Sequence, residues 1–112
     1  MSRRSRLAKP QPRAPVFAAL GDPTRLSLVA KLCAGQPSSI SQLTRGSRLT
    51  RQAITKHLRV LENAGLVRCV HTGRESLFKF NPQPLEAMKA YLDSVSAQWD
   101  NALSRLKFFV ED

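Results

Sequence analysis

The sequence predicts a single domain that is mainly α-helical and carries one small β-hairpin. Three observations lead to this fold class. Capped stretches with helical periodicity fill the chain up to residue 63, a short segment rich in β-branched and aromatic residues follows, and a run without helix breakers comes last. With 112 residues, of which 42% are hydrophobic, the chain can bury one core without disulfides or a metal.

The first two helical segments are bounded by turn residues. Residues 16–20 (VFAAL) form a short apolar stretch that stops at Gly21, and Asp22-Pro23 then places an N-cap before a proline at the first helical position. We expect this second helix to end at Gly35. Its apolar residues recur at spacings of three and four and form the expected buried face: Leu26, Val29, Ala30 and Cys33, with Leu28 and Leu32 beside them.

Two short helices separated by a turn come next. Residues 39–42 (SISQ) have the form of a capping box, so a helix should begin there and run to about Gly46. Thr50 is a further N-cap, and the run Arg51–Asn63 contains no Gly or Pro before Gly65 supplies a left-handed stop. This arrangement is typical of a helix-turn-helix.

A change of periodicity after residue 65 predicts the hairpin. Val67–Thr72 and Ser76–Phe80 read as strands, and Gly73-Arg74-Glu75 joins them as a turn. A hairpin placed directly after the second helix is a wing, so the fold becomes a winged helix-turn-helix. A last helix should then run from about Pro84 to Val110.

The charge is unevenly distributed along the chain, whose formal net charge is +10. Residues 1–15 carry five basic and no acidic side chains, and we expect them to form a flexible basic arm before a domain at 16–112; an inert leader is the alternative. Residues 16–80 carry ten basic and three acidic side chains, whereas 81–112 carry three and five. This distribution indicates that the middle of the chain meets a polyanion.

The helix Arg51–Asn63 has a polar face that suits the major groove of DNA. At 100° per residue, the apolar side gathers around Ile54, Leu58 and Leu61. The opposite side holds Gln, Thr, Lys, Arg and Asn without a carboxylate, which provides base-edge donors and acceptors and cations for phosphates. An ordinary solvated face is the alternative, but such a face usually interleaves acids with its cations.

The expected DNA contacts follow from position on this helix. Gln52, Thr55 and Lys56 lie near its N-terminus and should meet bases. Arg51 and Arg59 could reach guanine edges or phosphates, and phosphate is favoured for Arg59. Arg74, at the hairpin tip, could enter a minor groove or be a plain turn residue. The full predicted set is Arg48, Thr50, Arg51, Gln52, Thr55, Lys56, Arg59 and Arg74, with Arg68 and Lys79 as weaker phosphate contacts.

The last helix carries a heptad-like apolar stripe. Its residues recur at alternating spacings of three and four: Leu85, Met88, Leu92, Val95, Trp99, Ala102, Leu106 and Phe109. A helix of ~40 Å outreaches the core that the rest of the chain can build, so we expect a second copy to cover it and form a homodimer. Packing wholly within the monomer is the alternative.

Two segments resemble the ArsR/SmtB-type bacterial winged-helix repressors. They are residues 17–25 (FAALGDPTR) and 53–67 (AITKHLRVLENAGLV), and the likeness covers residues 16 to about 80. The long last helix, with Asn81-Pro82 before it and Trp99 within it, looks like the subgroup of SdpR-like autorepressors. The resemblance implies a dimeric repressor that binds double-stranded DNA at an imperfect palindrome near its own promoter. It also implies that the terminal helices form the dimer interface.

The known metal sites of that family find no match in this sequence. The family's thiolate motif lies on the first helix of the helix-turn-helix, where residues 39–43 (SISQL) contain no cysteine. Its other site uses Asp and His on the last helix, and no histidine occurs after His71 in this sequence. Cys33 is expected in the core, and a redox pair with Cys69 is a lesser alternative. The family's motif has a histidine at His57, which we expect to be structural. No metal or cofactor is predicted.

Several function classes are not supported. The chain has no Gly-rich phosphate loop, paired carboxylates or nucleophile beside a base, so we do not expect an enzyme. It has no apolar run that could span a bilayer and no secretory leader, so a cytoplasmic setting is expected. The remaining alternative to a sequence-specific repressor is a less specific nucleoid-associated or RNA-binding protein, whose binding would fall steeply with salt for every sequence.

Overall fold

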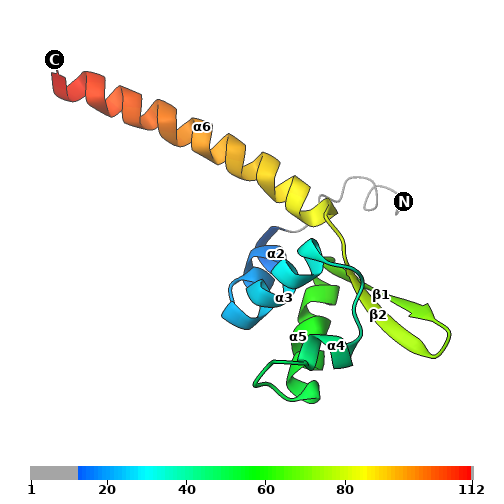
Figure 1. The fold of residues 1–112 in the computed structure, drawn as a ribbon. Helices are drawn as coiled ribbons and strands as arrows, with labels where there is room; N and C mark the ends of the chain where they lie inside the picture. Colours follow the sequence, from blue (N-terminus) through cyan, green and yellow to red (C-terminus); the bar gives the residue numbers. More distant parts are fainter. Residues whose placement is uncertain (1–12, 112) are drawn as a thin grey trace, which may run out of the picture.

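The computed structural model describes residues 13–111 and confirms the expected fold class (Figure 1). Five α-helices and two strands follow one another in the described chain: α2 (Arg13–Leu20), α3 (Pro23–Ala34), α4 (Ile40–Thr44), α5 (Arg51–Asn63), β1 (Val67–Thr72), β2 (Glu75–Phe80) and α6 (Gln83–Glu111). Most of the predicted basic arm lies outside the described residues. The boundary at residue 15 was placed too late, because α2 begins at Arg13. A proline at position 15 is tolerated there, since the first N–H groups of a helix have no partner within it.

Local capping bonds set the starts of three helices where the sequence placed them. The Asp22 carboxylate accepts the backbone N–H groups of Thr24 and Arg25, both at 3.0 Å. The capping box at the start of α4 closes in both directions, with bonds of 3.1 and 2.8 Å between Ser39 and Gln42. The Thr50 hydroxyl accepts from the N–H of Ala53 at 3.1 Å and starts α5.

The hairpin forms an antiparallel pair, and a short backbone bridge links it to the segment before α4. Its register pairs Val67 with Phe80 at the base and Thr72 with Glu75 at the tip. Strand β2 begins one residue earlier than expected, so the turn consists of Gly73, with a φ of 64°, and Arg74. Ser38, before α4, exchanges two backbone hydrogen bonds of 3.0 and 2.8 Å with Phe78, which joins the wing to the helix-turn-helix.

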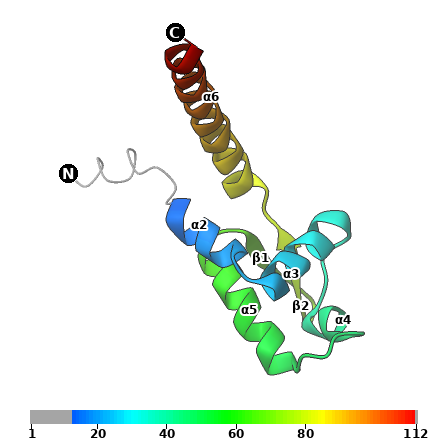
Figure 2. The ribbon, with the colours of Figure 1, turned by 90° about the vertical axis from the view of Figure 1, so that its left-hand side faces the viewer.

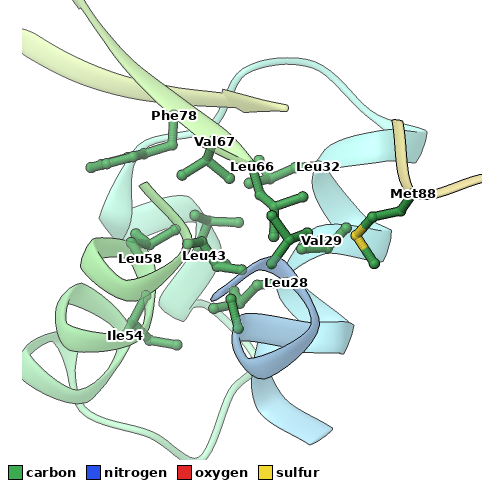
Figure 3. Close-up of a cluster of buried hydrophobic side chains, with 13 residues drawn as sticks. Leu28, Val29, Leu32, Leu43, Ile54, Leu58, Leu66, Val67, Phe78 and Met88 are labelled. Carbon is green, nitrogen blue, oxygen red and sulfur yellow. The ribbon is translucent and has the colours of Figure 1, made fainter. Parts of the chain in front are cut away.

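One apolar core lies where the helices meet the hairpin (Figure 3). Ile54, Leu58 and Leu61 are almost completely buried, as the periodicity of α5 predicts. Leu66 and Phe78 close the core from the side of the hairpin. Among residues 13–111, no polar or charged residue is buried, so this core needs no internal hydrogen bonds.

The expected buried face of α3 was wrong in its rotation about the helix axis. Leu28, Val29 and Leu32 are buried, whereas Ala30 and Cys33 are exposed and Leu26 is 52% exposed. Apolar residues occupy more than half of the circumference of this helix, so periodicity alone cannot choose which part faces inward. The packing of α5 and β2 against α3 makes that choice, and the expectation of a core Cys33 fails with it.

Helix α6 leaves the body of the domain after its first turns (Figures 1 and 2). Met88 is buried in the core, and Leu85 packs against it. Tyr91 also contacts the body of the domain. Its ring stacks edge-on against Phe17, with 6.5 Å between the ring centroids, and the Arg13 guanidinium lies 4.4 Å from the centroid of the Tyr91 ring. The remainder of the stripe is mostly exposed, as shown by Trp99 at 63%, so residues 13–111 leave most of it uncovered.

Candidate nucleic-acid interface

The N-terminal half of α5, which carries the predicted polar residues, lies at the end of the domain away from α6 (Figures 1 and 2). Arg51, Gln52 and Lys56 are exposed, and Thr55 is half-buried. These four side chains line one shallow hollow. The buried face of α5 fixes its rotation, so the structure brings together the residues for which the sequence predicted base contact.

Two hydrogen bonds define what this hollow can offer to a ligand. The Arg51 guanidinium donates from Nη1 to the Ser41 hydroxyl at 2.8 Å, which ties the arginine to α4 and leaves its other donors available. The Thr55 hydroxyl donates to the Arg51 backbone carbonyl at 2.7 Å. Sequence reasoning missed Ser41, because a serine within a short helix gives no sign of a partner ten residues further along the chain.

The cations around the hollow are free to meet an external anion. Arg48, in the loop before α5, is exposed, as is Arg59 in the third turn of α5. None of the cations at positions 48, 51, 56 and 59 forms an ion pair with a carboxylate of residues 13–111. Exposed cations that form no ion pair attract phosphates over a range set by salt screening.

The wing carries a second basic feature. Arg74 is exposed in the two-residue turn at its tip, apart from the hollow. Arg68 and Lys79 are exposed and face each other directly across the two strands. Like charges at such cross-strand positions destabilise a hairpin. An anion bound close to both side chains would reduce their repulsion.

Known proteins with this arrangement regulate transcription. Residues 20–70 match the model of a helix-turn-helix domain family. The chain is 39% identical over 77 residues to the uncharacterized HTH-type transcriptional regulator YuzN of Bacillus subtilis. This alignment covers 63% of this chain and 84% of the relative. It is 34% identical over 86 residues to the HTH-type transcriptional regulator Rv2034 of Mycobacterium tuberculosis, with 77% of each chain covered.

Solved structures extend this similarity to the fold. An ArsR-like transcriptional regulator from Rhodococcus sp. RHA1 superposes with a TM-score of 0.76 at 37% identity, covering 85% of this chain and 89% of that one. The chain belongs to the ArsR family. As an ArsR-family protein it is a sequence-specific DNA-binding transcriptional regulator, and its relatives are regulators, not enzymes.

A polar network in this ArsR-family protein connects α2, α3 and α5. The Arg25 guanidinium lies 3.2 Å from His57 Nδ1 on α5 and donates to the Ala19 carbonyl of α2 at 2.6 Å. His57 Nδ1 is also 3.9 Å from the Asp22 carboxylate, so the histidine has the structural surroundings that we expected. Sequence reasoning missed Arg25, although it lies within the segment 17–25 that carries the family resemblance.

Asp22 is the titratable group that this network perturbs. The backbone N–H of Arg25, which donates to the carboxylate, lowers the pKa of Asp22 below its ordinary value. Partial desolvation opposes this change, whereas the positive charges of Arg25 and His57 act in the same direction as the hydrogen bond.

The described residues show neither a cluster of metal ligands nor a membrane-spanning helix. Within residues 13–111, no three His, Cys, Asp or Glu side chains gather in a way that could hold an ion. Cys33 lies exposed on α3 and Cys69 is half-buried on β1. In the same part of the chain, every helix is too short or too polar to cross a bilayer.

Proposed function

We propose that the protein is a cytoplasmic homodimer that binds an inverted-repeat operator in double-stranded DNA and represses its own or a neighbouring operon. The observation that carries this proposal is the acid-free hollow at the start of α5, on the side of the domain that α6 leaves uncovered. A dimer through α6 would present two such hollows to one face of a duplex.

Each predicted contact has a role in this arrangement. Gln52, Thr55 and Lys56 meet base edges in the major groove. The first helix of a helix-turn-helix crosses the phosphate backbone, so the tie from Arg51 to Ser41 on α4 favours a phosphate contact for Arg51. Arg48 and Arg59 also bind phosphates, Thr50 caps the helix at the groove, and Arg74 reaches the adjacent minor groove.

The exposed stripe of α6 supports a dimer. Helix α6 has 29 residues, and seven of its large apolar side chains are exposed beyond its contacts with the body. Phe108 lies on one side of the helix, and the other six gather on the opposite side: Leu92, Trp99, Leu103, Leu106, Phe109 and Val110. A monomer rarely exposes so continuous an apolar surface. Each side chain contributes roughly 1.5–3 kcal/mol on full burial, so about twelve of them from two chains outweigh an association cost of roughly 4–15 kcal/mol.

Repression follows from occupancy of the DNA. Two reading helices related by a two-fold axis would meet half-sites about 10–10.5 base pairs apart, and a dimer spanning them excludes other proteins from the same DNA. The resemblance of the long last helix to autorepressors supports a site near the protein's own promoter.

Selection of random duplexes by the purified protein tests the proposal. We expect an inverted repeat, bound ~10³-fold more tightly than unrelated DNA at the same salt concentration. A reporter driven by the selected repeat should lose expression when the protein is present. Selected duplexes without a consensus, combined with a steep salt dependence for every sequence, would instead identify the less specific nucleic-acid binder.

A further inference from the structure

The hydroxyl of Thr55 already has a partner within its own helix. It donates to the Arg51 carbonyl at 2.7 Å, so its single proton is in use. In this conformation Thr55 cannot donate a hydrogen bond to the major-groove acceptors, which are N7 and O6 of guanine, N7 of adenine and O4 of thymine. What remains of its side chain for a ligand is the γ-methyl group, together with lone pairs on an oxygen that is turned towards the backbone.

The other side chains around the hollow are chemically different. Arg51, Gln52 and Lys56 end in polar or charged groups, and Arg51 is held towards α4. Thr55 is half-buried between them, one helical turn from Gln52 on the same face. Thr55 therefore supplies the only methyl group among the four side chains that line the hollow, and a base edge with its own methyl group complements it best.

We infer that Thr55 determines specificity by packing its γ-methyl against the C5-methyl of a thymine in each half-site. This inference rests on the proposed function, because it requires α5 to enter the major groove. To the proposed function it adds the identity of one base in each half-site, a thymine, and the side-chain group that recognises it. Thymine is the only base that presents a methyl group there, so uracil isolates the contact without changing any hydrogen-bonding atom.

The test is a uracil scan of the selected operator. Each thymine is replaced in turn, symmetrically in both half-sites, and the dissociation constant is measured for the wild type, Thr55→Ser and Thr55→Val. Serine keeps the hydroxyl and loses the methyl, whereas valine keeps a methyl and loses the hydroxyl. Thymines elsewhere in the operator and Gln52→Ala are the controls.

We expect one thymine at which uracil weakens wild-type binding about fourfold per half-site, the effect of burying one methyl group. Thr55→Val should keep that sensitivity, Thr55→Ser should lose it, and Gln52→Ala should leave it unchanged at this position. The inference is overturned if no thymine shows this pattern, or if valine loses the sensitivity as serine does. Either result leaves a selected inverted repeat intact, so failure here is distinct from failure of the proposed function.

Discussion

Leu106 and Phe108 form a matched pair that tests the proposed dimer. They are two residues apart near the end of α6, about 200° apart around its axis, and similarly exposed in the single chain, at 57% and 69%. Leu106 belongs to the apolar stripe, whereas Phe108 lies on the opposite side. Truncation to alanine should therefore affect association through one of them and not through the other.

The magnitude follows from the surface that the single chain leaves uncovered. Full burial of a leucine contributes roughly 1.5–3 kcal/mol, and the exposed 57% of Leu106 would provide about 0.9–1.7 kcal/mol of that in the interface. A two-fold dimer contains the residue twice, which gives about 1.7–3.4 kcal/mol. Leu106→Ala should therefore weaken dimerisation about 20- to 300-fold, and Phe108→Ala less than threefold.

Sedimentation equilibrium over a range of concentrations measures both effects. The thermal stability of the diluted, monomeric protein is the control for folding, and it should change little because both side chains are exposed in the single chain. Equal weakening by the two substitutions, or none by either, would refute the assignment of the stripe as the interface.

Three further predictions concern the reading helix, the cap of α3 and the wing. Gln52→Ala should relax base preference at one operator position, whereas Arg59→Ala should weaken the binding of all DNA sequences alike and reduce the slope of log affinity against log salt concentration by about one. Operator titrations at several salt concentrations check both variants. Unchanged affinity in both would contradict the assigned face. The lowered pKa of Asp22 means that its charged form stabilises the fold at pH values above the ordinary pKa of an aspartate. This stabilisation is lost as the pH falls through the folded-state pKa. Asp22→Asn should therefore be less stable than the wild type near neutral pH, and urea unfolding curves of the two should converge in acid; a constant difference would exclude the charge as the cause. Lys79→Glu places an opposite charge across from Arg68, so it should raise the stability of the domain by about 0.2–1 kcal/mol in thermal melts. The same substitution should weaken DNA binding in titrations. A lower stability would contradict repulsion between Arg68 and Lys79.

Helix boundaries were predictable because the signals that set them are local. The cap at Asp22, the capping box at Ser39 and the cap at Thr50 each involve residues two or three apart, and all three form as expected. The left-handed stop at Gly65 has a φ of 81° for the same local reason. The polar face of α5 was also predictable, since its apolar residues occupy one narrow side of the helix.

Contacts between distant segments decided the rest. The sequence could not choose the inward side of α3, because apolar residues cover too much of its circumference, and packing against α5 and β2 left Leu26 and Cys33 outside. The links from Ser41 to Arg51 and from Arg25 to His57 join separate helices, and no spacing along the chain reports such a meeting. Short-range hydrogen bonds and periodicity thus determine where α3, α4 and α5 begin and which side of α5 is polar, whereas the rotation of a broadly apolar helix depends on the surfaces available once the elements pack together.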